Sequence, residues 1–215
     1  MQLNPLFKRT LKLVSTPKII LSNELKSNLH VNFSKIEHVS LQKYSPKNVF
    51  RSCVNSFEDH TVFAGERCIE SSLAAIVASA FRSPGAGIVI VNAHPRVMDL
   101  VYTQKVKPDD IILIGTRRLD EREETFIKRT KIKTFSKALV NDIGIEAIMQ
   151  ETQWILDQNN RPSYHLSLDV DSVNEKELKF IGSYANHVWF DDFGSLDLTG
   201  TNKTQMKAIK YCLVN

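Results

Sequence analysis

The chain has 215 residues, of which 42% are hydrophobic and 24% are charged, so it is long enough and apolar enough to fold as one globular domain. No stretch approaches the roughly 18 to 20 consecutive apolar residues that a membrane-spanning helix requires. The three cysteines, Cys53, Cys68 and Cys212, are odd in number and lack the spacing of metal ligands, which indicates free thiols in a reducing compartment.

The formal net charge is +4, and the excess lies near the start, where four basic residues precede the first acid: Lys8, Arg9, Lys12 and Lys18. We expect residues 1–25 to form a solvated N-terminal arm of a cytoplasmic protein. The part between Pro5 and Pro17 is interpreted as a short helix or an irregular segment. A basic mitochondrial presequence is the alternative, whereas the apolar core of a secretory signal is missing.

In the first half, strands and helices are expected to alternate. Short strands are predicted at 19–21 and 39–41, a turn at Ser45-Pro46, a strand at 61–64, an amphipathic helix at 69–81 and a strand at 87–92. The last of these is a continuous run of β-branched residues, which is typical of a parallel strand covered on both faces.

The second half continues the alternation. Strands are predicted at 111–115, 132–135, 164–168 and 187–190, and helices at 119–131, 143–156, 175–181 and 203–214. The helix at 119–131 is heavily charged, and Glu123, Glu124, Lys128 and Arg129 offer pairs at i,i+4 on an exposed face. The alternation predicts a single α/β domain over residues 1–215 with a mainly parallel sheet.

Two carboxylates, Asp169 and Asp171, directly follow the expected strand at 164–168. Residues two apart on a strand share a face, so these side chains are expected to lie together at its carboxyl end, where parallel sheets bind ligands. Two carboxylates at such a short distance repel each other, so a cation, a proton or an arginine must lie nearby to stabilise them.

Polar residues also follow two other expected strands. The segment Gly65-Glu66-Arg67-Cys68 follows the strand at 61–64, and Asn92-Ala93-His94-Pro95-Arg96 closes the strand at 87–92. Because the carboxyl ends of parallel strands share one edge of a sheet, we expect the three polar segments to converge there.

These three segments, with Ile114-Gly115-Thr116-Arg117-Arg118 between the second and the third, resemble the ureohydrolases: arginase, agmatinase and formimidoylglutamase. Those enzymes carry Gly-Gly-Asp-His-Ser, Asp-Ala-His-x-Asp, Ile-Gly-x-Arg and Ser-x-Asp-Val-Asp segments in this order. The resemblance implies a three-layer α/β/α arginase-like fold. In the family, the first, second and fourth segments bind a dinuclear manganese centre that hydrolyses linear amidines.

Carried over position by position, half of the ligand set differs. His94, Asp169 and Asp171 match the family, whereas Arg67 stands at a histidine position, and Asn92 and Arg96 stand at aspartate positions. The family also has a long segment with its catalytic glutamate after the last motif. Here only residues 172–186 separate Asp171 from the expected strand at 187–190.

An arginine carries only hydrogen-bond donors and keeps its charge, so it cannot bind a metal. We expect Arg67 and Arg96 to pair with Asp169 and Asp171 in a charge network without metal. The predicted protein is therefore a pseudoenzyme of the ureohydrolase family, with no catalytic residue and no cofactor. Its predicted role is binding, scaffolding or regulation within a homo- or hetero-oligomer.

Two alternatives remain open. One is a divergent metal-dependent hydrolase of amidino or guanidino compounds, with manganese on His94, Asp169 and Asp171 and a further ligand from the Asp191-Asp192 pair. The other is a protein that binds a small molecule or anion through Arg67 and Arg96.

Three further features have ordinary interpretations. Cys68 beside Arg67 can have a lowered pKa, but without an evident base it is interpreted as a buried thiol. Arg117, Arg118 and the basic residues at 128–133 are interleaved with acids, which indicates a solvated helix and no nucleic-acid site.

Overall fold

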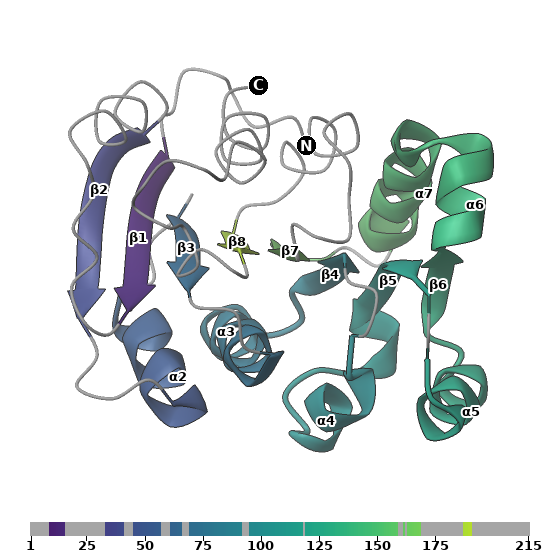
Figure 1. The fold of residues 1–215 in the computed structure, drawn as a ribbon, viewed down its shortest axis with the longest axis horizontal. Helices are drawn as coiled ribbons and strands as arrows, with labels where there is room; N and C mark the ends of the chain where they lie inside the picture. Colours follow the sequence, from purple (N-terminus) through teal and green to yellow (C-terminus); the bar gives the residue numbers. More distant parts are fainter. Residues whose placement is uncertain are drawn as a thin grey trace.

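A computed structural model of the chain describes residues 9–15, 33–40, 45–56, 61–65, 69–91, 95–117, 119–158, 161, 163–168 and 187–190. The described strands form one sheet in the order β2-β1-β3-β8-β7-β4-β5-β6, and all neighbours pair in parallel (Figure 1). The strands are β1 (Arg9–Ser15), β2 (Phe33–Ser40), β3 (Thr61–Gly65), β4 (Gly87–Val91), β5 (Ile111–Thr116), β6 (Lys133–Ser136), β7 (Tyr164–Leu168) and β8 (His187–Phe190).

Helices cover the sheet on both faces, so the predicted three-layer α/β/α fold is confirmed (Figure 1). One layer contains α2 (Pro46–Asn55), α3 (Ile69–Arg82), α4 (Val97–Tyr102) and α5 (Glu121–Thr130), and the other contains α6 (Lys137–Ile143) and α7 (Ile145–Gln158). A short 3-10 helix, η1 (Pro108–Asp110), precedes β5. Among the described helices, none has the length and apolar character needed to cross a bilayer.

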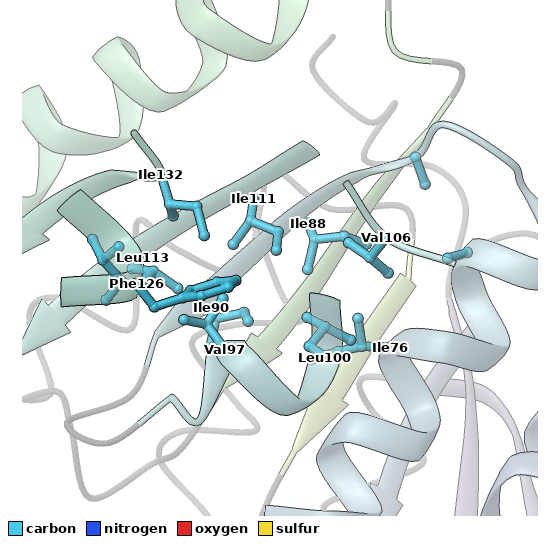
Figure 2. Packing of buried hydrophobic residues seen from close by; sticks show 13 residues of the cluster. Ile76, Ile88, Ile90, Val97, Leu100, Val106, Ile111, Leu113, Phe126 and Ile132 are labelled. Atoms are coloured by element: carbon cyan, nitrogen blue, oxygen red, sulfur yellow. The ribbon is translucent and has the colours of Figure 1, made fainter. Parts of the chain in front are cut away.

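The core on the first face is built by alternate residues of the central strands. Ile88 and Ile90 of β4 are buried in one cluster with Ile76 of α3, Leu100 of α4 and Phe126 of α5 (Figure 2). Side chains two apart on a strand share a face, so β4 presents every second apolar residue to this helix layer. The remaining residues of β4 face the opposite layer, which explains why the whole strand is apolar.

On the second face, α7 approaches β4 closely at Gly87. A Cβ atom at this position would lie 3.1 Å from both Cδ atoms of Leu156 and from a ring carbon of Tyr164. The buried residues of α7 recur at helical spacing, namely Ile145, Ile148, Met149, Thr152 and Leu156. The absence of a side chain at Gly87 therefore lets α7 pack directly on the strand.

A buried ion pair joins the segments that precede β5 and β7, on either side of β4. The Asp110 side chain is 7% exposed and the Arg161 side chain is 14% exposed. The Arg161 guanidinium donates a hydrogen bond to the Asp110 carboxylate and forms a salt bridge with it. Asp110 also accepts a hydrogen bond from the backbone N–H of Lys107 at 3.0 Å, and Arg161 donates to the carbonyl of Asp109 at 2.9 Å. This cluster fixes the amino-terminal edge of the sheet.

The sequence prediction was wrong at two places in the first half. The segment between Pro5 and Pro17 contains β1, a strand within the sheet and neither a helix nor an irregular segment. Ser45-Pro46 begins α2 and is not a turn: the Ser45 Oγ accepts from the backbone N–H of Asn48 at 3.3 Å. Serine at the N-cap followed by proline is a helix start, because that proline has no N–H to leave unpaired.

Two short helices, α4 and α6, were not predicted. α4 has 6 residues and α6 has 7, which is too short for an apolar period to stand out. The predicted helix at 143–156 corresponds to α7, and Gly144, with a φ of 87°, separates it from α6. Both β3 and β7 coincide with the predicted strands to within a residue. The elements predicted at 19–21, 175–181 and 203–214 lie outside the described residues.

Candidate functional site

Four strands bring the predicted site segments to one edge. β3, β8, β7 and β4 are consecutive in the sheet and parallel, so their carboxyl ends lie side by side. The segments with Arg67, Asp169 and His94 directly follow β3, β7 and β4. This strand order supplies the topology that the predicted convergence requires.

β7 is the strand from which the two predicted carboxylates follow. Its register with β4 pairs Val91 with Leu168, so the chain leaves both strands at the same level. His165 and Ser167 are buried, and their partners in β4 belong to the face covered by α3, α4 and α5. Asp169, Asp171, Arg67, Asn92 and His94 lie outside the described residues.

Of the residues predicted to stand at ligand positions, the structure describes Arg96, and its backbone is unusual. It precedes the first residue of α4 with φ 46° and ψ 43°, in the left-handed region, and its side chain does not cap the helix. For a residue with a Cβ atom this conformation costs about 1 kcal/mol or more. The surrounding structure therefore holds Arg96 in a backbone conformation that it would not adopt alone.

The Arg96 guanidinium is bound by two carboxylates. Its Nη1 lies 2.8 Å from Oε1 of Glu70, and its Nη2 lies 2.5 Å from Oδ2 of Asp99. The hydrogen bond that Arg96 donates to Glu70 is the main cause that raises the pKa of Arg96 above its ordinary value, and Asp99 adds to it. Arg96 therefore remains a cation, and a guanidinium cannot serve as a metal ligand.

These partners differ from the ones that the sequence prediction named. Arg96 was expected to pair with Asp169 and Asp171, which are outside the described residues, whereas the described pairs are with Glu70 and Asp99. Glu70 is in the first turn of α3 and Asp99 is in the first turn of α4. Arg96 thus connects the starts of the two helices that follow β3 and β4.

Glu123 caps the start of α4, which the Arg96 side chain does not cap. Although it belongs to α5, its side chain is buried, and its Oε1 accepts from the backbone N–H of Val97 at 2.5 Å. Burial raises the pKa of Glu123, while the N–H groups of Val97 and Met98 lower it. The backbone N–H of Glu123 is itself capped by Oδ1 of Asp120 at 2.8 Å. A chain of caps therefore connects the starts of α5 and α4.

Sequence reasoning missed this role of Glu123. It placed Glu123 on a solvated face, and the structure confirms that interpretation for its neighbour Glu124, which pairs with Lys128 at 2.9 Å. The signal that was available is the Asp120-x-x-Glu123 spacing, which is typical of a helix start with reciprocal capping. No local sequence pattern predicts that the Glu123 side chain contacts a different helix.

The remaining candidates have ordinary environments where the structure describes them. Cys53 is a buried free thiol whose pKa is raised by burial, so it is an unreactive core residue. Cys68, Cys212 and Arg118 lie outside the described residues, and Arg117 is exposed. Within the described ranges, no three His, Cys, Asp or Glu side chains lie where they could hold a metal ion together.

The fold and the row of polar segments define a parallel α/β/α protein with its candidate site at the carboxyl edge of the sheet. The family model described as "Arginase family" matches residues 70–178, about half of the chain. This chain therefore belongs to the arginase family, and the predicted ureohydrolase resemblance is confirmed.

Similar proteins with curated names are bacterial arginases. The arginase of Staphylococcus aureus (strain COL) is 34% identical over 95 residues, which are 44% of this chain and 32% of that protein. The arginase of Bacillus caldovelox is 34% identical over 91 residues, 42% of this chain and 30% of that protein. The matched region thus spans about a third of the length of these relatives.

Solved structures support the fold. An arginase from Bacillus subtilis superposes with a TM-score of 0.73 at 16% identity and covers 97% of this chain and 99% of that one. A formimidoylglutamase from Bacillus subtilis superposes with a TM-score of 0.66 at 12% identity and covers 96% of this chain and 87% of that one. At these identities the similarity establishes the arginase fold alone.

Proposed function

We propose that this arginase-family protein lacks a dinuclear manganese centre and amidinohydrolase activity, and acts as a binding, scaffolding or regulatory protein. The observation that carries the proposal is the environment of Arg96. A cation takes the place of an aspartate ligand of the family, and two carboxylates from α3 and α4 compensate its charge. A divalent ion at this position would meet a positive charge and a group that cannot coordinate it.

The sequence differences at Arg67 and Asn92 support the same proposal. An arginine replaces a histidine ligand of the family, and an amide replaces a carboxylate. Manganese sites in proteins favour carboxylate ligands, whose negative charge the ion neutralises. With these replacements, the ligand set keeps three of its six side chains, and two of the other three are cationic.

Metal analysis tests the proposal directly. The full chain is expressed with added manganese, passed through gel filtration, and measured by mass spectrometry of the metal content, beside the Bacillus subtilis arginase as a positive control. We expect far less than one manganese ion per chain and no rise in melting temperature with added manganese. Two tightly bound ions per chain would contradict the proposal.

A divergent hydrolase is the second candidate function, and one observation favours it. His94, Asp169 and Asp171 have the family's ligand types, and they follow strands that are adjacent and in register. In this case the remaining residues would hold a single manganese ion. Release of urea or ammonia from arginine, agmatine or formimidoyl-glutamate, lost in a His94→Ala variant, would establish it. The absence of turnover across this panel, with or without manganese, would rule out the hydrolase function.

The proposal of a small anion at Arg67 and Arg96 has less support. Both terminal nitrogens of Arg96 already contact carboxylate oxygens of Glu70 and Asp99. An anion would have to displace one of them or bind to the donors that remain. A rise in melting temperature with phosphate or acetate that disappears in an Arg96→Met variant would support such a site.

A further inference from the structure

The basic residues of the chain are concentrated near its start. Residues 1–56 contain nine lysines and arginines and two acids, a net charge of +7, whereas the whole chain has a net charge of +4, so residues 57–215 carry −3. The described elements of the basic part, β1, β2 and α2, lie together at one end of the molecule (Figure 1). A charge asymmetry of this kind indicates a polyanionic partner.

Three cations in the helix layer at this end are exposed and unpaired. Lys47 and Arg51 are one turn apart on α2, and Arg82 is the last residue of the neighbouring helix α3. α2 contains no acid, and the acid of α3, Glu70, is in its first turn and pairs with Arg96. Within the described part of the chain, none of the three cations forms an ion pair with a carboxylate. Their charges are therefore available to a partner.

An aromatic pair connects α2 and α3 next to these cations. Phe81, which directly precedes Arg82, is 54% exposed. Its ring packs edge to face on Phe50, the residue before Arg51, with centroids 6.1 Å apart and an angle of 73° between the planes. The contact holds the Phe81 ring in place while about half of the side chain stays open to solvent. We call Lys47, Phe50, Arg51, Phe81 and Arg82 the basic surface.

We propose that the basic surface binds single-stranded nucleic acid without sequence preference. Proteins that do so combine cations that contact the phosphates with aromatic side chains on which the bases stack. The basic surface has both, and its exposed ring is already fixed by a second ring. It is separate from the basic residues at 128–133, for which the sequence predicts no nucleic-acid site and among which Lys128 pairs with Glu124 at 2.9 Å.

This proposal names a partner class for the proposed binding role, but it does not depend on the loss of the metal centre. The basic surface contains no ligand position, so manganese analysis and nucleic-acid binding give independent results. A failure of one would leave the other unchanged.

An anionic membrane is the other polyanion that the charge would attract, and α2 suits it less well. A helix that binds at a membrane interface needs a free apolar face. The apolar face of α2 is occupied, because Val49 and Cys53 are buried in a cluster with three alanines of α3. Phe81 then offers one half-exposed ring, which is enough to stack a base but gives little insertion into lipid.

The salt dependence of binding tests the role of the cations. Fluorescence anisotropy of a labelled oligouridylate of about 16 nucleotides, a length that covers typical single-strand sites, is measured with the full chain at several salt concentrations. Each phosphate contact on a single strand contributes about −0.7 to the slope of log K against log salt concentration, so three cations predict a slope of about −2 or steeper. The double variant Lys47→Gln, Arg51→Gln should make the slope shallower by about 1.4.

The matched control for charge is the double variant Lys105→Gln, Arg122→Gln. Both residues are exposed and lie outside the basic surface, Lys105 after α4 and Arg122 on α5. This variant loses the same amount of charge, so the salt slope should stay at the wild-type value. A general effect of net charge would change both double variants equally.

A matched pair of aromatic variants tests the stacking. Phe81→Ala should weaken binding of the oligouridylate at least about fivefold at constant salt, because a base loses the ring on which it stacks. Tyr102 on α4 is 62% exposed and packs edge to face on Phe126 with centroids 5.8 Å apart, so Tyr102→Ala removes a ring in a similar environment outside the basic surface. Tyr102→Ala should leave the affinity unchanged. Melting curves verify that every variant folds.

Four results would overturn the proposal. The first is no change in anisotropy at the lowest salt concentration, and the second is a wild-type salt slope in the Lys47 and Arg51 double variant. The third is wild-type affinity in Phe81→Ala. The fourth is that polyglutamate, which has charge but no bases, competes as well as unlabelled oligouridylate. Sedimentation with phosphatidylserine vesicles that depends on the basic surface, while oligouridylate binding does not, would assign the surface to a membrane instead.

Discussion

The buried pair of Asp110 and Arg161 offers a quantitative test of how the sheet is held together. Asp110→Ala removes the carboxylate that binds Arg161 and accepts from the backbone N–H of Lys107. The guanidinium then keeps its charge at a site where it is 14% exposed. We expect the free energy of unfolding to fall by about 3–5 kcal/mol, because an uncompensated charge is left in the interior.

The size of this effect follows from burial. An exposed ion pair contributes between about 0 and 1 kcal/mol, whereas removing one member of a buried pair costs several times more. For a domain of this size, each kcal/mol changes the melting temperature by about 2–4 °C, so the predicted decrease is about 6–20 °C. The total free energy of unfolding of a protein is typically about 5–15 kcal/mol, so an effect of this size is a large part of it.

The assay is urea unfolding followed by tryptophan fluorescence and circular dichroism, applied to a double-mutant cycle. The variants are Asp110→Ala, Arg161→Met and the two combined. Because the combined variant leaves no unpaired charge, it should be more stable than the sum of the two single losses predicts. A loss below about 1 kcal/mol for Asp110→Ala, or simple additivity in the cycle, would refute the reasoning.

Four further predictions concern single sites. The variant Glu123→Gln removes the titrating group. Because burial raises the pKa of Glu123 in the folded state above 4.5, the stability of the wild type relative to this variant should fall as pH increases from about 4.5 through the folded pKa. A stability difference that does not vary with pH would contradict this prediction. Gly87→Ala should lower stability by about 1–3 kcal/mol in urea unfolding, because the new methyl group meets Leu156 at 3.1 Å. Ser45→Ala should cost about 1 kcal/mol by the same assay, because α2 loses its N-cap, and a Ser45→Asn variant should retain the stability. Arg96→Gly should change stability by less than about 1 kcal/mol, since relief of the left-handed backbone offsets the loss of two exposed ion pairs; a larger loss would show that these pairs are strong.

Much of the fold was predictable because its central strands and long helices have local apolar patterns. The strands at 87–91 and 111–116 are nearly continuous apolar runs, and α3 and α7 show helical periodicity. The order of four motifs along the chain identified the family. These features depend on residues close in sequence, so no tertiary information is needed to detect them.

The errors in the predicted elements have a different origin. The segment of β1 mixes basic and apolar residues without a strict period, and pairing with β2 and β3 makes it a strand. At Ser45-Pro46, the same two residues suit a turn and a helix start, and the buried Val49 and Cys53 on α2 favour the helix. In both places the packing partner, which is distant in sequence, selects one of two conformations that are locally acceptable.

By itself, the sequence determined the parallel α/β class and the family, and it predicted which residues stand at the ligand positions. Only the tertiary structure decided that β7 and β8 lie between β3 and β4, that Arg96 pairs with Glu70 and Asp99, and that Glu123 caps another helix. The physical reason is that a basic side chain can form an ion pair with any of several acidic residues along the chain, and the sequence does not single out one of them. Which of them it meets depends on where the backbone places the starts of helices that are far apart in sequence.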